Sequence, residues 1–367
     1  MNGFKQKPSW DLNNKSINYF DFDVLKSGLQ KSIRRCLVRD ALWYAVELDS
    51  YTIYGKEGEK YRTNMINRIK VIMLEDCFNP NLILKIGKWI REWEICRKEE
   101  KSKKILMNIV FHLASVPKCR LLEESNFYHR MDYIKSKYVD EYIDLFVSVY
   151  DWDETVSNII RFLKEDEFKN KTLTMKVSRF FYLLERKESG CLFWLHLILE
   201  ESTNVKRYKR KGVEWLVWTL LFSLSNSKES FFKKFTKSQL NRKNLLNLLF
   251  NFRKDKLREN HLFLQYAVQL FLKEDYISWD NKFDNASISD EKVEELYSYN
   301  SNKNKIDIID CVYDRHTFSG RRMGRGFKHF CKVSSVVYNK DPMFYNKRLR
   351  KLFIRLNKNR DIEKSLI

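Results

Sequence analysis

The glycine and arginine residues near the C-terminus form the part of this sequence best suited to chemistry with a ligand. Residues 314–330 read D-R-H-T-F-S-G-R-R-M-G-R-G-F-K-H-F, and we call them the glycine–arginine segment. Glycine permits positive φ and close approach of a partner to the backbone, whereas arginine and lysine supply cations. This combination predicts a site for an anion, most naturally a phosphate.

The residues expected to contact phosphate come from this segment and from the basic stretch that follows it. Between residues 315 and 360 there are fourteen lysines and arginines but a single acidic residue, Asp341. A local excess of cations is typical of proteins that bind a polyanion. The predicted phosphate-binding residues are His316, Thr317, Gly320, Arg321, Arg322, Gly324, Arg325, Gly326, Lys328, His329, Lys347, Arg348, Arg350 and Lys351.

Three phenylalanines, Phe318, Phe327 and Phe330, are interleaved with these cations. Aromatic rings in such a setting stack on exposed bases of a nucleic acid, or they anchor the segment to the rest of the protein. The sequence leaves both roles open for all three rings.

A catalytic alternative rests on the carboxylates just before the segment. Asp307, Asp310 and Asp314 recur at i, i+3 and i+7, which would place them along one face of a helix, close to His316. A magnesium-dependent nuclease using Asp310, Asp314 and His316 is therefore one hypothesis. The competing interpretation, which we favour, is that these carboxylates neutralise nearby arginines or cap turns.

Other catalytic and metal-binding signatures are missing from the sequence. It contains no G-x-x-x-x-G-K-[ST], no H-E-x-x-H and no G-x-S-x-G, which argues against a P-loop nucleotide enzyme. Cys311, His316, His329 and Cys331 are potential zinc ligands, but their spacing does not fit a zinc finger. We therefore expect a protein that is not an enzyme and that uses neither a metal nor another cofactor.

Charge is distributed unevenly along the chain, whose formal net charge is +21. A second basic block covers 206–258, whereas 140–168 is acidic. This asymmetry suits a protein that binds a polyanion with one surface and a protein partner with another. A plainer interpretation is that the charge serves solubility and follows from codon bias, because the abundance of Lys and Asn also fits an AT-rich genome.

The cysteines and the apolar runs restrict the cellular setting. Seven cysteines are scattered without a C-x-x-C pair, as expected for reduced thiols in the cytoplasm or nucleus. The first ten residues lack the apolar stretch of a secretory signal. The most apolar run, 213–224, is too short to span a bilayer, so we expect no membrane partner.

Apolar residues recur at helical spacing, and glycine and proline are few, which predicts an all-α fold. We expect a multi-helix bundle or stacked helix pairs, with a basic, Gly/Arg-rich C-terminal segment. Expected domains are an N-terminal helical region (1–130), a middle helical region (131–280), a linker (281–305) and the C-terminal segment (306–367). The expected helices are 25–48, 61–77, 82–93, 103–115, 139–149, 155–164, 175–186, 191–201, 213–224, 243–252 and 261–273, a short acidic one near Ser289, and a basic one or a solvated tail at 347–358.

Residues 25–90 resemble a known family through L-Q-K-S-I-R-R (29–35), A-L-W-Y-A-V-E-L (41–48) and N-R-I-K-V-I-M-L-E-D (67–76). They look like the helical C-terminal region of the MgsA-type AAA+ ATPases, the replication-associated recombination protein A family related to clamp loaders. The chain lacks that family's ATPase module, so the resemblance implies only oligomerisation or a role near DNA. The matching positions are Lys31, Ser32, Arg34, Arg35, Ala41, Leu42, Trp43, Arg68, Glu75 and Asp76.

The pattern D-x-H-T-x-x-G-R-x-x-G-R-G (314–326) is also similar to segments that accompany such helices in stand-alone proteins of large DNA viruses. That similarity implies a viral factory or a virion as a further setting. The sequence thus predicts a non-catalytic nucleic-acid-binding protein, with DNA favoured, in replication, repair or genome packaging. The alternative is an assembly scaffold, forming homo-oligomers or binding an acidic protein partner.

Overall fold

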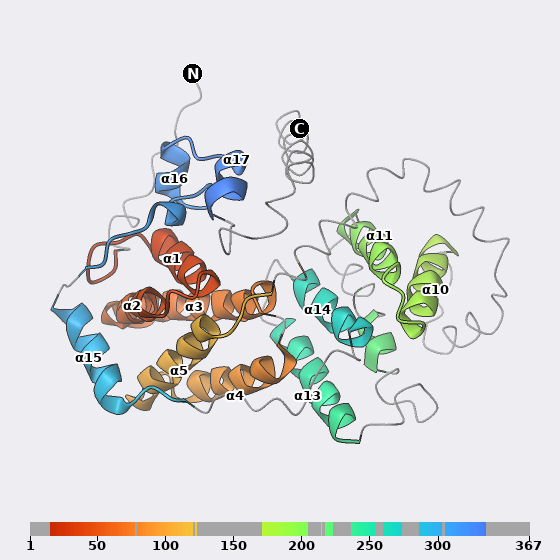
Figure 1. Cartoon of the computed structure of the whole chain (residues 1–367), viewed down its shortest axis with the longest axis horizontal. Coiled ribbons are helices and arrows are strands. Elements are labelled where there is room, and N and C mark those ends of the chain that lie inside the picture. The colour runs from red at the N-terminus through yellow and green to blue at the C-terminus, as the bar shows by residue number, and fades with distance from the viewer. Residues whose placement is uncertain are drawn as a thin grey trace. The chain divides into compact units, whose positions relative to one another are not determined.

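The computed structural model describes residues 15–77, 79–119, 122, 171–204, 214, 217–222, 236–253, 260–273, 286–302 and 305–334. Within them every regular element is a helix, apart from one isolated bridge between Lys15 and Asp21, which confirms the all-α class (Figure 1). None of the helices in these ranges is both long enough and apolar enough to cross a bilayer. The helices expected at 139–149, 155–164 and 347–358 lie outside the described residues.

The chain divides into two compact units, and the first is assembled from separated stretches of sequence. It comprises Met1–Cys77, Lys85–Cys119 and Asp284–Ile367, and the second comprises Phe78–Leu84 and Arg120–Phe283. The longer helices of the first unit are α1 (Phe22–Arg34), α2 (Val38–Asp49), α3 (Gly55–Glu75), α4 (Pro80–Cys96) from Lys85 onward, α5 (Lys101–Ser115) and α15 (Asp290–Ser301).

The expected single helix over 25–48 is wrong, because α1 and α2 are separate helices that pack against each other. Cys36 adopts a left-handed φ of 58°. Its N–H donates to the Ile33 carbonyl at 3.1 Å, and that of Leu37 donates to the Ser32 carbonyl at 2.9 Å. This pair of bonds is a Schellman motif, which satisfies the last carbonyls of α1 and turns the chain.

Packing of α1 follows from the spacing of its apolar residues. Leu25, Leu29 and Ile33 recur every four residues and are fully buried. Their helix contacts α2, α3 and α5, so α1 packs against three other helices of the first unit. The helix thereby becomes the element on which other parts of the unit are assembled.

Helix α15 falls within the range expected to be a linker, and it packs against α2 and α5. It begins at the N-cap Ser289, whose hydroxyl accepts from the backbone N–H of Lys292 at 3.3 Å. The backbone N–H of Ile288 also donates to the buried side chain of Asn108 at 2.9 Å. The short acidic helix expected near Ser289 is therefore confirmed.

A buried carboxylate, Glu47 on α2, joins distant parts of the first unit. It accepts from the backbone of Asn18 at 2.9 Å and from the Asn18 amide at 2.7 Å. It also accepts from the Asn300 amide at the end of α15. Glu47 is fully buried, and its donors are side-chain and main-chain amides, so hydrogen bonds stabilise its position.

The second unit contains α10 (Lys171–Glu185), α11 (Cys191–Asn204), α13 (Thr236–Arg253) and α14 (Asn260–Leu272). The pairs α10–α11 and α13–α14 pack against each other. Arg242, from the basic block at 206–258, is buried here with its guanidinium 5.5 Å from the Phe271 ring centroid. Burial lowers the pKa of Arg242 to about 10, so this cation supports packing and does not belong to a surface patch.

Replacing Glu47 by Ala should destabilise the first unit strongly. The change leaves the Asn18 and Asn300 amides without their acceptor, at a cost of about 1–3 kcal/mol for each buried donor. Urea unfolding monitored by circular dichroism measures the loss. Glu57→Ala is the matched control, because Glu57 is 71% exposed and its removal should change the free energy of unfolding by less than about 0.5 kcal/mol.

Candidate functional site

The glycine–arginine segment and its flanks are held against α1. Ser27 donates its hydroxyl to the Val312 carbonyl at 2.8 Å, and the N–H of Phe318 donates to the Asp23 carboxylate at 2.6 Å. Arg35, just beyond α1, donates to the Val333 carbonyl at 2.7 Å. The short helices of this region are η4 (Asp310–Val312), α16 (Phe318–Arg322), α17 (Phe327–His329) and η5 (Phe330–Ser334), seen beside α1 in Figure 1.

A buried ion pair between Lys31 of α1 and Asp314 anchors the start of the segment. The side chain of Lys31 is 5% exposed and that of Asp314 is 0% exposed. Lys31 also donates to Ser27 Oγ at 2.6 Å, and Asp314 accepts from the backbone N–H of His316 at 2.8 Å. Burial lowers the pKa of Lys31 below its ordinary value, while the attraction of Asp314 opposes that effect.

Gly320, the first glycine of the segment, is required for close packing of the segment's own backbone. Thr317 caps α16 by accepting from the N–H of Gly320 at 3.0 Å, and its hydroxyl donates to the Asp314 carbonyl at 3.0 Å. A Cβ at Gly320 would lie 2.0 Å from that carbonyl oxygen, so only glycine fits. The close approach expected of a ligand at this residue is therefore made by the chain itself.

The other two glycines differ from each other. Gly324 has a φ of 69° and open space around it, as expected for a residue that must reach the left-handed region. Gly326 has a φ of −83°, and a side chain there would meet open space, so positive φ is not its role. Among the three glycines, Gly324 alone shows the backbone conformation that the sequence predicts.

Part of the positive charge of the segment is neutralised internally. Arg325 donates to the carbonyls of Asp310 at 2.7 Å and of Tyr313 at 2.9 Å, and it forms an ion pair with the Asp310 carboxylate. The ring of His329 lies 3.7 Å from the same carboxylate. Arg325 and His329, both predicted to contact phosphate, thus hold Asp310.

Four other cations are exposed, and none of them forms an ion pair with a carboxylate among the described residues. The guanidinium of one of them, Arg321, donates to the carbonyls of Arg315 and His316, each at 3.3 Å, which orients the side chain. This set, which we call the exposed cations, consists of Arg321, Arg322, Lys328 and Lys332.

His316 contributes differently from the cations. Partial desolvation lowers its pKa from the ordinary value, and Asp314 opposes that shift, whereas the charges of Arg315 and Arg68 add to it. The lowered pKa favours the neutral imidazole at pH 7, which can offer hydrogen bonds to a ligand. Its ring packs edge-to-face on Phe330, with 5.1 Å between centroids.

The carboxylates of the nuclease hypothesis serve separate cations in the structure. Residues 305–309 are not helical, and only 310–312 form a short turn of 3-10 helix, so the shared helical face expected for Asp307, Asp310 and Asp314 does not form. Asp310 pairs with Arg325, and Asp314 pairs with Lys31. No group of three or more potential metal ligands occurs within the described part of the chain.

The four remaining predicted positions come after the glycine–arginine segment in the sequence. Lys347, Arg348, Arg350 and Lys351 lie outside the described residues. Lys332 was not among the predicted phosphate-binding residues, although its place in the basic run at 315–360 was a usable signal.

The positions that carry the family resemblance all belong to the first unit, and most of them are buried there. Arg34 is buried and pairs with Asp76 at 2.7 Å and with Glu75 at 3.7 Å, which joins α1 to the end of α3. Lys31 and Arg35 hold the C-terminal part of the unit through Asp314 and the Val333 carbonyl. These residues therefore build the scaffold beneath the candidate site.

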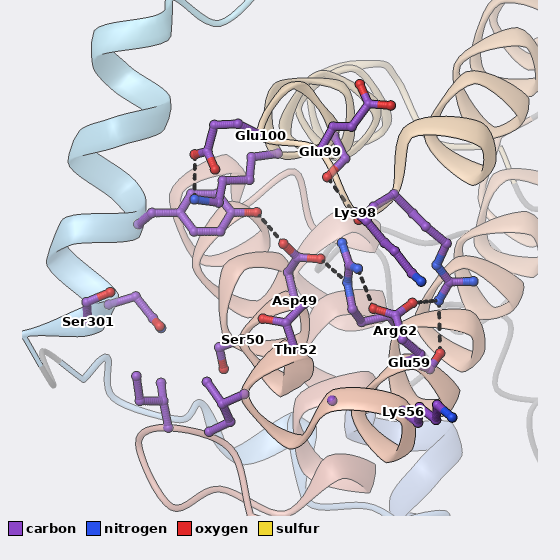
Figure 2. A pocket seen from close by; sticks show the side chains of 18 residues that line it. Asp49, Ser50, Thr52, Lys56, Glu59, Arg62, Lys98, Glu99, Glu100 and Ser301 are labelled. Carbon is purple, nitrogen blue, oxygen red and sulfur yellow. Dashed lines mark hydrogen bonds and ion pairs between the residues drawn. The ribbon is translucent and has the colours of Figure 1, made fainter.

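A cavity of about 630 Å³ in the first unit has no counterpart among the sequence predictions. It lies among residues 49–62, the turn before α5 and the end of α15 (Figure 2). Arg62 pairs there with Asp49 at 2.7 Å and with Glu59 at 2.8 Å, and the Tyr297 hydroxyl donates to Asp49 at 2.8 Å. The lining residues come from distant parts of the sequence, so no local sequence pattern predicts the cavity. The charges of Arg62, Asp49 and Glu59 neutralise one another, which indicates that they stabilise the fold.

No family model matches this chain, and no curated protein or solved structure matches it either. The resemblance of residues 25–90 to the MgsA-type helical region stays a prediction. The function therefore has to be inferred from the geometry and charge of the site itself.

Replacing Asp314 by Ala should release the segment from α1 and destabilise the first unit by about 3–5 kcal/mol, because Lys31 is left buried without its partner. Chemical unfolding and limited proteolysis of the segment measure the effect. Asp310→Ala is the control, because this carboxylate is 65% exposed and should contribute less than about 1 kcal/mol. Equal losses for the two variants would contradict the anchoring role of Asp314.

Proposed function

We propose that this protein binds nucleic acid without catalysing a reaction, gripping phosphates with the exposed cations of the glycine–arginine segment and its flank. The observation that carries the proposal is the sorting of charge within this region. Asp310 and Asp314 are occupied by Arg325 and Lys31, while Arg321, Arg322, Lys328 and Lys332 have no carboxylate partner among the described residues. Replication, repair or genome packaging, with DNA favoured, is the proposed setting.

The geometry suits a phosphate backbone for two physical reasons. Arg321 and Arg322 carry planar guanidinium groups that can bind phosphate oxygens through two parallel hydrogen bonds. Four like charges close in sequence also repel one another, and a polyanion relieves this repulsion while releasing counterions. The net charge of +21 adds long-range attraction to the same partner.

The packing of the segment on α1 adds support. Arg35, Ser27 and Asp23 fix its backbone, and Lys31 fixes Asp314, so the exposed cations project from a positioned surface. Binding therefore costs less ordering entropy than it would for a solvated basic tail. An assembly scaffold with an acidic protein partner would use the same cations. If mutation of these cations removes a co-purifying protein but leaves nucleic-acid binding intact, the scaffold function is favoured over nucleic-acid binding.

Replacing Arg321, Arg322 and Lys328 together by Ala should weaken nucleic-acid binding and its salt dependence. Each lost phosphate contact lowers the slope of log affinity against log salt by about 0.7–0.9, so the triple variant should lose about 2–3 from the slope. Fluorescence anisotropy with labelled single- and double-stranded oligonucleotides from about 50 mM salt upward measures both quantities.

The control replaces Lys60, Lys101 and Lys292 by Ala, because these lysines are exposed but each pairs with a glutamate. This variant should keep the wild-type affinity and slope within twofold. An unchanged affinity in the Arg321, Arg322 and Lys328 variant, or no binding by the wild type at low salt, contradicts the proposal. Retained nucleic-acid binding with loss of a co-purifying protein supports the scaffold function.

A further inference from the structure

We propose that the site selects single-stranded nucleic acid, with the ring of Phe318 stacking on an unpaired base while the exposed cations hold the adjoining phosphates. This inference rests on the proposed function and names its substrate class. Single-stranded DNA and RNA share the chemistry concerned, namely a base with a free π-face beside a phosphate.

The position of Phe318 carries the inference. It is the first residue of α16, directly after the capping residue Thr317, and its side chain remains 39% exposed. Its backbone N–H is held by Asp23 of α1 at 2.6 Å. The ring is therefore presented from a fixed backbone on the exposed part of the segment. A positioned ring loses little conformational entropy when a base stacks on it.

The other two phenylalanines of the segment hold it together. Phe330 packs edge-to-face on His316 with 5.1 Å between centroids, and it lies 6.3 Å from Phe327. The guanidinium of Arg315 lies 5.1 Å from the Phe327 centroid. Both rings are partly buried. Phe327 and Phe330 therefore pack against each other and their neighbours, whereas Phe318 is the exposed ring of the three.

Cations lie beside the exposed ring. Arg322 lies one helical turn after Phe318, with its guanidinium 5.9 Å from the ring centroid, and Arg321 is its neighbour. Met323 follows and is 56% exposed, which extends the apolar surface among the charges. A base placed on this surface would keep its phosphates within reach of both arginines.

A duplex would use this surface poorly. Its bases are stacked on one another, so Phe318 and Met323 would face charged backbone and gain nothing from burial. A single strand offers unstacked bases, and each base that stacks on an aromatic side chain strengthens binding about 5- to 150-fold. The alternation of ring and cations therefore favours a single strand.

The test compares three fluorescein-labelled ligands of equal length in anisotropy titrations with the full chain. They are a thymine strand, the same strand with abasic sites throughout, and a duplex. The wild type should bind the thymine strand about 5- to 150-fold more tightly than the abasic strand, and more tightly than the duplex. Phe318→Leu, which keeps apolar volume but removes the ring, should bring the thymine strand to the abasic level.

Tyr299→Leu is the matched control, because Tyr299 is an exposed aromatic residue on α15, and it should leave all three affinities unchanged. Thermal unfolding confirms that Phe318→Leu is folded. Equal affinity for thymine and abasic strands, a preference for the duplex, or an unaltered ratio in Phe318→Leu would overturn the inference and leave phosphate binding intact. Failure of the wild type to bind any of the three ligands at low salt would instead overturn the proposed function.

Discussion

The buried ion pair between Lys31 and Asp314 is the interaction on which the candidate site depends. An ammonium group and a carboxylate are both removed from water here, and each is tolerable only in the presence of the other. A buried pair of this kind contributes little net stability, because the cost of removing both charges from water offsets much of their attraction. Because Asp314 also accepts from the backbone of His316, the pair sets where the glycine–arginine segment begins and which of its groups remain outside.

Because of this constraint, basic residues that look equivalent in the sequence have different partners in the structure. Lys31, Arg34 and Arg35 are all basic and close in sequence, yet they hold Asp314, Asp76 and the Val333 carbonyl respectively. Arg325 is likewise used within the segment. Within the described part of this basic run, the cations that remain for a partner are those on α16, α17 and η5.

Much of the fold could be predicted from the sequence, because the spacing of residues such as Leu25, Leu29 and Ile33 identifies a helix without knowledge of its neighbours. The boundary at Cys36 could not, since a Schellman turn commonly uses glycine and this one does not. The Lys31–Asp314 pair joins residues 283 positions apart, which no local pattern reports. The sequence predicts close approach of a partner at Gly320, but the partner is the backbone of Asp314 and not a ligand. Sequence alone cannot distinguish these two cases.

The discontinuous first unit imposes an order on how the protein is made. Helices α1, α2 and α3 leave the ribosome long before Asn300 and Asp314 are synthesised, so Glu47 and Lys31 must wait for partners encoded 253 and 283 residues later. During that interval their charged groups stay hydrated and the surrounding apolar surface stays incompletely packed. Completion of the unit therefore waits for the synthesis of these later residues, and the surface that carries the exposed cations forms only after Lys332 has been translated.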